Sequence, residues 1–174
     1  EISIGHMEKT CLNWFFNQWY FGKGYPKLEV KSTFDPMKKQ VTVNVAQTQE
    51  EKFEFPLSID VLENGKISRK EFWVTAKAKN DFVFDVTKNP ELINANPEGL
   101  LLSDIKQDKT PEQLYLQYTT AKDLYSKYTA IEEAKDQVSK NPFADKLYAA
   151  ALKDKFYRNR LLALEGLPED PKSF

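Results

Sequence analysis

Residues 53 to 61 read FEFPLSIDV, and this stretch decides the class of the fold. Its large apolar side chains occupy every second position: Phe53, Phe55, Leu57, Ile59 and Val61. A period of two is typical of a β-strand with one buried face. Pro56 within it predicts an edge position or a bulge, because proline lacks the donor of a sheet hydrogen bond. Asn64 and Gly65 follow as the dipeptide that suits a two-residue hairpin.

The same alternation continues on both sides of this hairpin. It predicts strands over residues 28–34, 41–46, 67–76 and 82–86, with a further short strand around 100–105. The last of these follows the turn sequence Asn96-Pro97-Glu98-Gly99. Six or seven short strands at this spacing are typical of an antiparallel, Ig-like β-sandwich. We expect this domain to cover residues 26–108 and to fold independently.

A helix is predicted before the sandwich, in the segment LNWFFNQWYFGKGYP of residues 12–26. Its apolar stripe has spacings of three and four residues: Leu12, Phe15, Phe16 and Trp19. We expect the helix over about residues 9–21, since Gly22, Gly24 and Pro26 end it. Aromatic residues lie on its other side as well, and a helix that is apolar nearly all round belongs inside a larger structure.

Helices are predicted after the sandwich. The sequence TPEQ makes Thr110 an N-cap, Pro111 the first helical residue and Gln113 the partner in a capping box. Apolar spacing then predicts one long helix, or two that break near residues 119–120. Asn141 and Pro142 begin another, and residues 155–165 form the last. The fold class expected is α+β: a β-sandwich followed by a helical segment over residues 109–174.

Composition excludes several classes of function. The net charge is −1, so no strong positive field attracts nucleic acid. No apolar run approaches the roughly 20 residues that span a bilayer. The chain has one cysteine, Cys11, and one histidine, His6, too few for a disulfide or a typical catalytic zinc site. Residues 5–7, GHM, are open to a second interpretation as a cloning remnant.

The aromatic helix has three possible roles. A stacking platform for sugars or bases needs exposed rings beside polar groups, and a membrane-surface helix needs a strongly basic face. Helical spacing favours burial, and the basic face is missing. Packing against other protein is therefore the preferred hypothesis, with Phe15, Phe16, Trp19 and Tyr20 as the candidate domain-interface residues.

Four segments together resemble one family: WFFNQWYFGKGYP at 14–26, KLEV at 27–30, VNVAQTQ at 43–49 and FEFPLSIDV at 53–61. They are similar to the aminopeptidase N family of zinc metallopeptidases, the alanyl aminopeptidase-type gluzincins. In that family a Trp-Phe-x-x-Gln-Trp helix ends the thermolysin-like catalytic domain. A β-sandwich and an armadillo/HEAT-like helical domain follow.

The resemblance implies a fragment without catalytic residues. The family's zinc signature, its substrate-amine segment and its catalytic tyrosine have no counterpart in this sequence. Residues 1–25 would be the terminal helix of a missing catalytic domain, 26–108 the sandwich and 109–174 the start of the helical C-terminal domain. The parent would be a zinc-dependent aminopeptidase acting on peptides, whose zinc lies outside this chain. The fragment would brace the catalytic domain and wall the substrate chamber.

Further expectations follow on partners and location. The main partner would be the parent's own catalytic domain, and self-association through the aromatic helix is a second possibility. We expect no nucleic acid partner and no membrane span. The alternative hypothesis is a stand-alone β-sandwich binding module for carbohydrate or protein adhesion. The compartment, cytoplasmic or periplasmic, is left open by the sequence.

Overall fold

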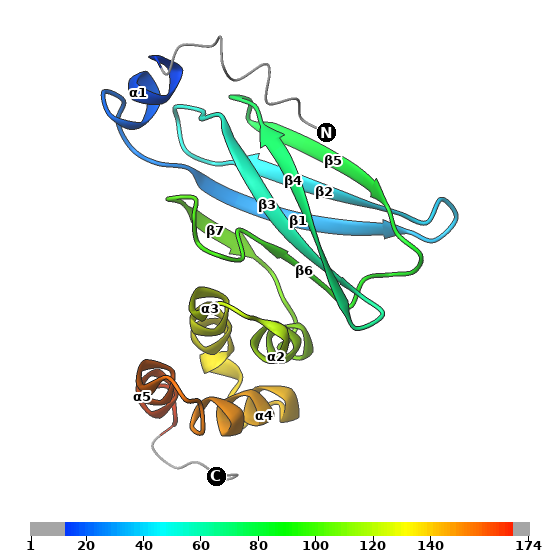
Figure 1. The fold of residues 1–174 in the computed structure, drawn as a ribbon, viewed down its shortest axis with the longest axis vertical. Helices are drawn as coiled ribbons and strands as arrows, with labels where there is room; N and C mark the ends of the chain where they lie inside the picture. The colour runs from blue at the N-terminus through cyan, green and yellow to red at the C-terminus, as the bar shows by residue number, and fades with distance from the viewer. Residues whose placement is uncertain (1–12, 169–174) are drawn as a thin grey trace.

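The computed structural model of this chain describes residues 13–168. A β part and an α part are stacked along the long axis of the molecule (Figure 1), so the predicted α+β class is confirmed. A short helix, α1 (Asn13–Trp19), lies beside the β part at the end far from the other helices. The helix predicted over residues 9–21 begins before the described residues. His6 and Cys11 also lie outside the described residues.

Two sheets form the β part. One has the strand order β5-β2-β1-β7 and the other the order β4-β3-β6. The strands in chain order are β1 (Lys27–Asp35), β2 (Gln40–Gln47), β3 (Phe55–Glu63), β4 (Lys66–Val74), β5 (Lys79–Asp85), β6 (Leu92–Ala95) and β7 (Asp104–Gln107). Asn64 and Gly65 join β3 to β4 with φ values of 53° and 70°, as the two-residue hairpin requires.

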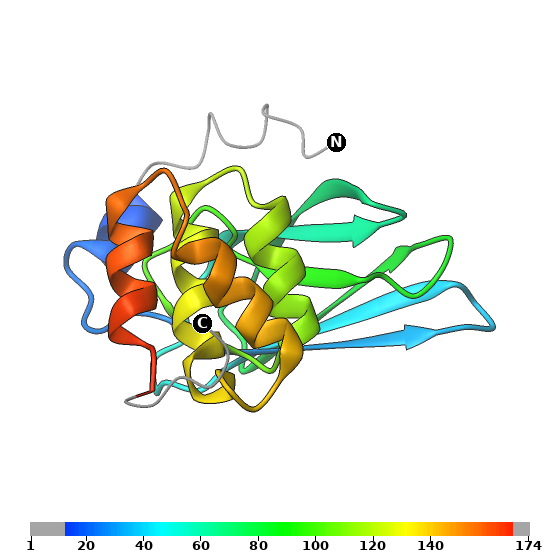
Figure 2. The ribbon, with the colours of Figure 1, turned by 90° about the horizontal axis from the view of Figure 1, so that it is seen from below.

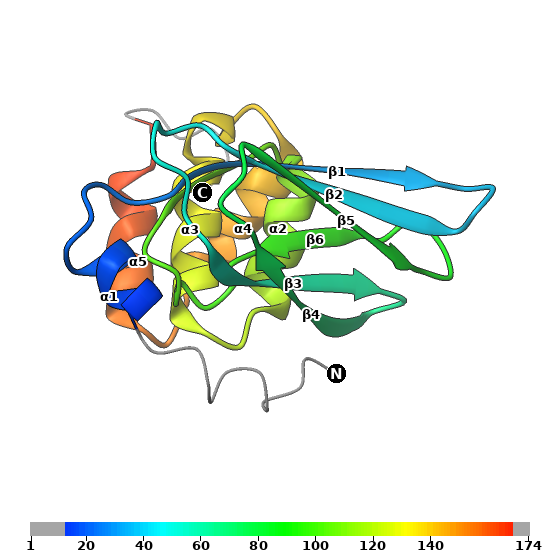
Figure 3. The same ribbon diagram turned by 90° about the horizontal axis from the view of Figure 1, so that it is seen from above.

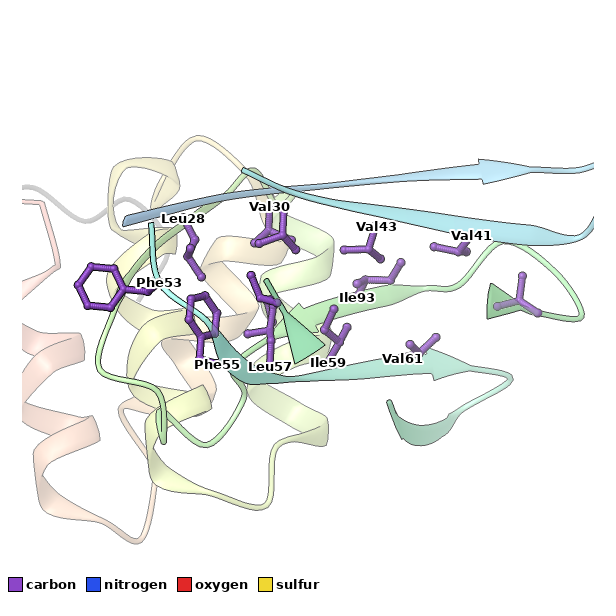
Figure 4. Close-up of a cluster of buried hydrophobic side chains, with 14 residues drawn as sticks. Leu28, Val30, Val41, Val43, Phe53, Phe55, Leu57, Ile59, Val61 and Ile93 are labelled. Carbon is purple, nitrogen blue, oxygen red and sulfur yellow. The ribbon is translucent and has the colours of Figure 1, made fainter. Parts of the chain in front are cut away.

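The alternating apolar residues face one another between the sheets. From β1 and β2 come Leu28, Val30, Val41, Val43 and Val45, and opposite them on β3 lie Phe55, Leu57, Ile59 and Val61 (Figure 4). Each of these side chains is almost fully buried. Burial of each one contributes roughly 1.5–3 kcal/mol, so the period-two segments supply the main stabilisation of the sandwich.

The sheets differ from the expected arrangement in two strands. Strand β7 pairs with β1 in parallel, with Lys27 opposite Asp104, whereas a fully antiparallel sandwich was predicted. It also begins at Asp104 and not near residue 100. Strand β6 was not predicted at all, because all four of its residues are buried and no alternation marks it. It pairs with Ile59–Leu62 only, so β3 is effectively an edge at Pro56, which explains the tolerated proline.

Helices α2 (Pro111–Thr120), α3 (Leu124–Ala134), α4 (Pro142–Ala151) and α5 (Tyr157–Glu165) form the α part, with a short 3-10 turn, η2 (Lys135–Gln137), after α3. The predicted capping box is present: Gln113 N donates to Thr110 Oγ1 at 3.2 Å, and Thr110 N donates to Gln113 Oε1 at 2.9 Å. Asp123 caps the start of α3, so the chain forms two helices here and not one. Within residues 13–168 no helix is long and apolar enough to cross a membrane.

A small polar joint connects the two parts. Ser126 of α3 donates a hydrogen bond to the carbonyl of Pro97 at 2.6 Å and accepts one from Asn94 of β6 at 3.3 Å. All three residues are buried. Viewed from below, the helices cover one end of the sandwich, while the β1–β2 hairpin projects at the other (Figure 2). The joint therefore fixes the helices near the β6 edge.

Candidate domain interface

Helix α1 packs on the sandwich through two tryptophans. The ring of Trp14 lies 5.5 Å from that of Trp73 on β4, in an edge-to-face arrangement. The ring of Trp19 lies 5.3 Å from that of Phe53. These are the three tryptophans of the sequence, and all of them lie where α1 meets the sandwich. Such aromatic pairs contribute about 0.5–1.5 kcal/mol each beyond the area they bury.

A side-chain amide completes the attachment of α1. Gln18 Nε2 donates to the carbonyl of Glu54 at 2.8 Å, and Glu54 N donates to Gln18 Oε1 at 2.7 Å. The Gln18 side chain thus forms with Glu54, the residue before β3, the two backbone hydrogen bonds that a neighbouring strand would otherwise form. Both hydrogen-bonding groups of the Glu54 backbone are satisfied in this way, which fixes α1 in position as well as in orientation.

A second amide holds the segment to which α1 is attached. Gln47 at the end of β2 is buried, and its Nε2 donates to the carbonyls of Phe53 and Thr75 at 2.8 and 3.1 Å. Its Oε1 accepts from the N–H of Phe53 at 2.9 Å. Phe53 therefore has a fixed backbone and a buried ring against which Trp19 can pack.

Four aromatic rings on α1 and directly after it remain exposed to solvent. Phe15 and Phe16 are exposed, Tyr20 is 74% exposed, and Phe21 is similarly open. The rings contact one another edge to face, with centroid separations of 5.7 Å for Phe15–Phe16, 6.4 Å for Phe16–Tyr20 and 5.0 Å for Tyr20–Phe21. We call these four residues the aromatic patch. Contiguous apolar surface of this kind marks interaction sites in soluble proteins.

The structure separates the four residues selected from the sequence. Phe15, Phe16 and Tyr20 are exposed and belong to the aromatic patch, whereas Trp19 packs on the sandwich. Sequence reasoning missed Trp14 and Gln18 as attachment residues. Their spacing of four places them on one side of a helix, but a polar glutamine gives no apolar signal.

A cleft of about 370 Å³ lies between strands β3 and β4 and the α2–α3 junction, and three of its charged side chains are paired with one another. Arg69 Nε lies 2.8 Å from Asp60 Oδ1, and Arg69 Nη1 lies 2.7 Å from Glu98 Oε1. Hydrogen bonds to Asp60 first, and then to Glu98, raise the pKa of Arg69 above its ordinary value. A guanidinium that keeps its proton and holds both carboxylates does not form an acid/base couple. Among residues 13–168, no group of three or more potential ligands could hold a metal ion.

Comparison with known proteins supports a fold assignment. No family model matches the sequence, and no curated protein matches it. A solved structure of Legionella pneumophila aminopeptidase A in complex with aspartic acid is similar to this chain, with a TM-score of 0.68 and 17% sequence identity. The match covers 88% of this chain but only 19% of that one. The chain therefore has a fold similar to a region of an aminopeptidase, about one fifth of its length.

Proposed function

We propose that this chain is a non-catalytic region of a zinc-dependent aminopeptidase, a parent enzyme of the aminopeptidase N type that removes amino-terminal residues from peptides. In this role the chain braces the catalytic domain and walls the substrate chamber. The observation that carries the proposal is the double role of helix α1. Trp14, Gln18 and Trp19 fix it to the sandwich, while the aromatic patch beside them stays exposed.

Attachment to the sandwich together with an exposed aromatic patch makes α1 a connector between two bodies. Its attachment to the sandwich is specific, because Gln18 pairs with both backbone groups of Glu54. Its patch has four aromatic rings that gain roughly 1.5–3 kcal/mol each when they are fully buried. A catalytic domain packed on the patch would thus be held to a rigid sandwich. The zinc and the peptide-binding groups belong, in this proposal, to that domain.

Replacing Phe16 and Tyr20 with serine tests the proposal. In the parent enzyme we expect a loss of about 3–6 kcal/mol of stability, because two interface rings are removed from apolar contact. In the isolated chain the same double substitution should leave the melting temperature nearly unchanged, since both rings are exposed. Thermal melts of both proteins, with aminopeptidase turnover of the parent, are the measurements.

A control variant at an attachment residue of α1 separates the interface from the helix itself. Trp14→Ala should loosen α1 in the isolated chain and shift the tryptophan emission towards the red, because Trp73 loses its ring contact. Equal melting of the parent with and without Phe16→Ser and Tyr20→Ser would contradict the proposal. Glycan binding that disappears in the double variant would favour a stand-alone binding module, and a monomer–dimer equilibrium that disappears would assign the patch to self-association.

A further inference from the structure

The loop that joins β6 to β7 presents two leucines to solvent. Leu100 is 81% exposed and Leu102 is 71% exposed, whereas Leu101 between them packs against the core of the sandwich. The side chains therefore alternate outward, inward and outward over three residues. Outward leucines at this level of exposure stabilise nothing within the chain, because their apolar area remains in water.

Hydrogen bonds within this loop fix its backbone. Asn96 is buried and adopts a positive φ of 49°. Its Nδ2 donates to the carbonyl of Leu101 at 3.0 Å, and its Oδ1 accepts from the N–H of Leu101 at 3.1 Å. Its own carbonyl accepts from Gly99 N at 3.0 Å. One asparagine thus satisfies both backbone groups of the residue that separates the exposed leucines.

Contacts with the neighbouring helix α3 and strand β4 also fix the loop. The carbonyl of Pro97 accepts the hydrogen bond from Ser126 of α3, and Glu98 forms an ion pair with Arg69 of β4. Gly99 is packed so closely on the ring of Tyr125 that a Cβ there would lie 2.8 Å from it. The two leucines are consequently held on a rigid support, and rigid anchors lose little conformational entropy when a partner covers them.

The loop lies next to the exit of α1. Tyr25 donates a hydrogen bond to Asp104 Oδ2 at 2.9 Å, and Asp104 N donates to the carbonyl of Pro26 at 3.0 Å. Asp104 follows Leu102 by two residues. Helix α1 and this loop lie on the same side of the molecule, away from the β1–β2 hairpin, and the loop lies between α1 and helices α2–α5 along the long axis (Figures 1 and 3). Exposed apolar residues of the loop and of α1 therefore share one side of the molecule.

We propose that Leu100 and Leu102 are anchor residues for the same polypeptide body that covers the aromatic patch, namely the catalytic domain of the parent enzyme. This inference rests on the proposed function and adds a second contact to it. A single body can reach both sites because the chain between them is tied together at Tyr25, Pro26 and Asp104. The similar aminopeptidase chain is long enough to supply such a body, since the match covers only 19% of it. Convex leucines on a fixed loop fit shallow apolar pockets on the surface of that domain.

Hydroxyl-radical footprinting of the unaltered proteins tests this inference. Oxidation rates of individual side chains are measured by mass spectrometry in the isolated chain and in the parent enzyme. We expect Leu100 and Leu102 to react about tenfold more slowly in the parent, because interface anchors are excluded from solvent. Met37, which is 92% exposed on the β1–β2 turn at the opposite end, serves as the internal control and should react equally in both.

The outcomes separate this inference from the function on which it rests. Protection of Phe16 and Tyr20 without protection of the leucines would overturn the inference and leave the proposed function in place. Absence of protection at both the leucines and the aromatic patch would overturn both the inference and the proposed function. Protection of the leucines in the isolated chain that increases with its concentration would assign them to a second copy and overturn the inference. In a second measurement, Leu100→Ser with Leu102→Ser should lower the melting temperature of the parent but not that of the isolated chain.

Discussion

Replacing Gln47 with leucine is expected to destabilise the chain by about 4 kcal/mol, although leucine has a similar volume and suits a buried position. The cost arises from the groups that glutamine leaves behind. The N–H and the carbonyl of Phe53 are both buried and both bond to Gln47. Each buried backbone group that loses its partner costs about 1–3 kcal/mol, and the carbonyl of Thr75 loses a donor as well.

Urea unfolding followed by tryptophan fluorescence measures this effect at two levels. The unfolding midpoint gives the loss of global stability. Emission before the transition reports on α1, because Trp19 packs on Phe53. Gln40→Leu is the matched control at the other end of β2, where the glutamine forms an exposed bond to Asp85, and it should cost less than about 1 kcal/mol. Equal stability of the two variants would show that Gln47 does not hold this segment.

Strands β2 and β3 were predicted correctly because each has one buried and one more open face. Residues 53–61 alternate because β3 has the sandwich core on one side, and the observed strand, Phe55–Glu63, follows that signal. Strand β6 is buried on both faces, between the core and the helices, so its sequence LINA carries no period. The leucines at residues 100–102 were wrongly assigned to a strand, since β7 begins only at Asp104. Leu100 and Leu102 lie on the surface of a loop and Leu101 packs on the core, and sequence periodicity cannot distinguish this arrangement from a strand.

The position of the candidate interface in the sequence was predicted, but the contacts of its side chains were not. Aromatic density and helical spacing identified α1, and the exposed rings of Phe15, Phe16 and Tyr20 lie there. Which residues of α1 pack on the sandwich and which stay exposed could not be predicted, because residues around the whole helix are apolar or amide-bearing. The deciding contacts are with Glu54, Phe53 and Trp73, which are distant in sequence. The role of Phe15, Phe16, Trp19 and Tyr20 as a domain interface stays a prediction.

The carboxylate of Asp154 connects several helices of the α part. Asp154 follows α4, and its side chain is only 7% exposed. It accepts hydrogen bonds from Tyr118 Oη of α2 at 2.6 Å, from Lys127 Nζ of α3 at 3.0 Å and from the N–H of Phe156, before α5, at 2.8 Å for its other oxygen. Asp154→Ala is therefore expected to cost about 3–5 kcal/mol, since it leaves a partly buried lysine and a buried tyrosine without their acceptor. Tyr118→Phe removes a single bond and should cost about 1 kcal/mol.

The same carboxylate predicts a dependence of stability on pH. Burial alone would raise the pKa of Asp154, but the hydrogen bonds from Tyr118, Phe156 N and Lys127 outweigh it and hold the pKa well below its ordinary value. The unfolded chain binds this proton near pH 4, whereas the folded chain does not. The stabilisation is therefore complete above about pH 5 and decreases as the pH falls through the depressed folded pKa.

Asp154→Asn isolates this contribution, because asparagine has the same shape and does not titrate. Its deficit in unfolding free energy relative to the unaltered chain should be largest at neutral pH and should decrease as the pH falls from about 5 to about 2. Chemical unfolding followed by far-ultraviolet circular dichroism at a series of pH values measures the difference. Asp136→Asn is a suitable control, since Asp136 is exposed on η2 and its replacement should leave the profile unchanged. A deficit that stays constant over this range would mean that Asp154 is held by packing and not by its charge.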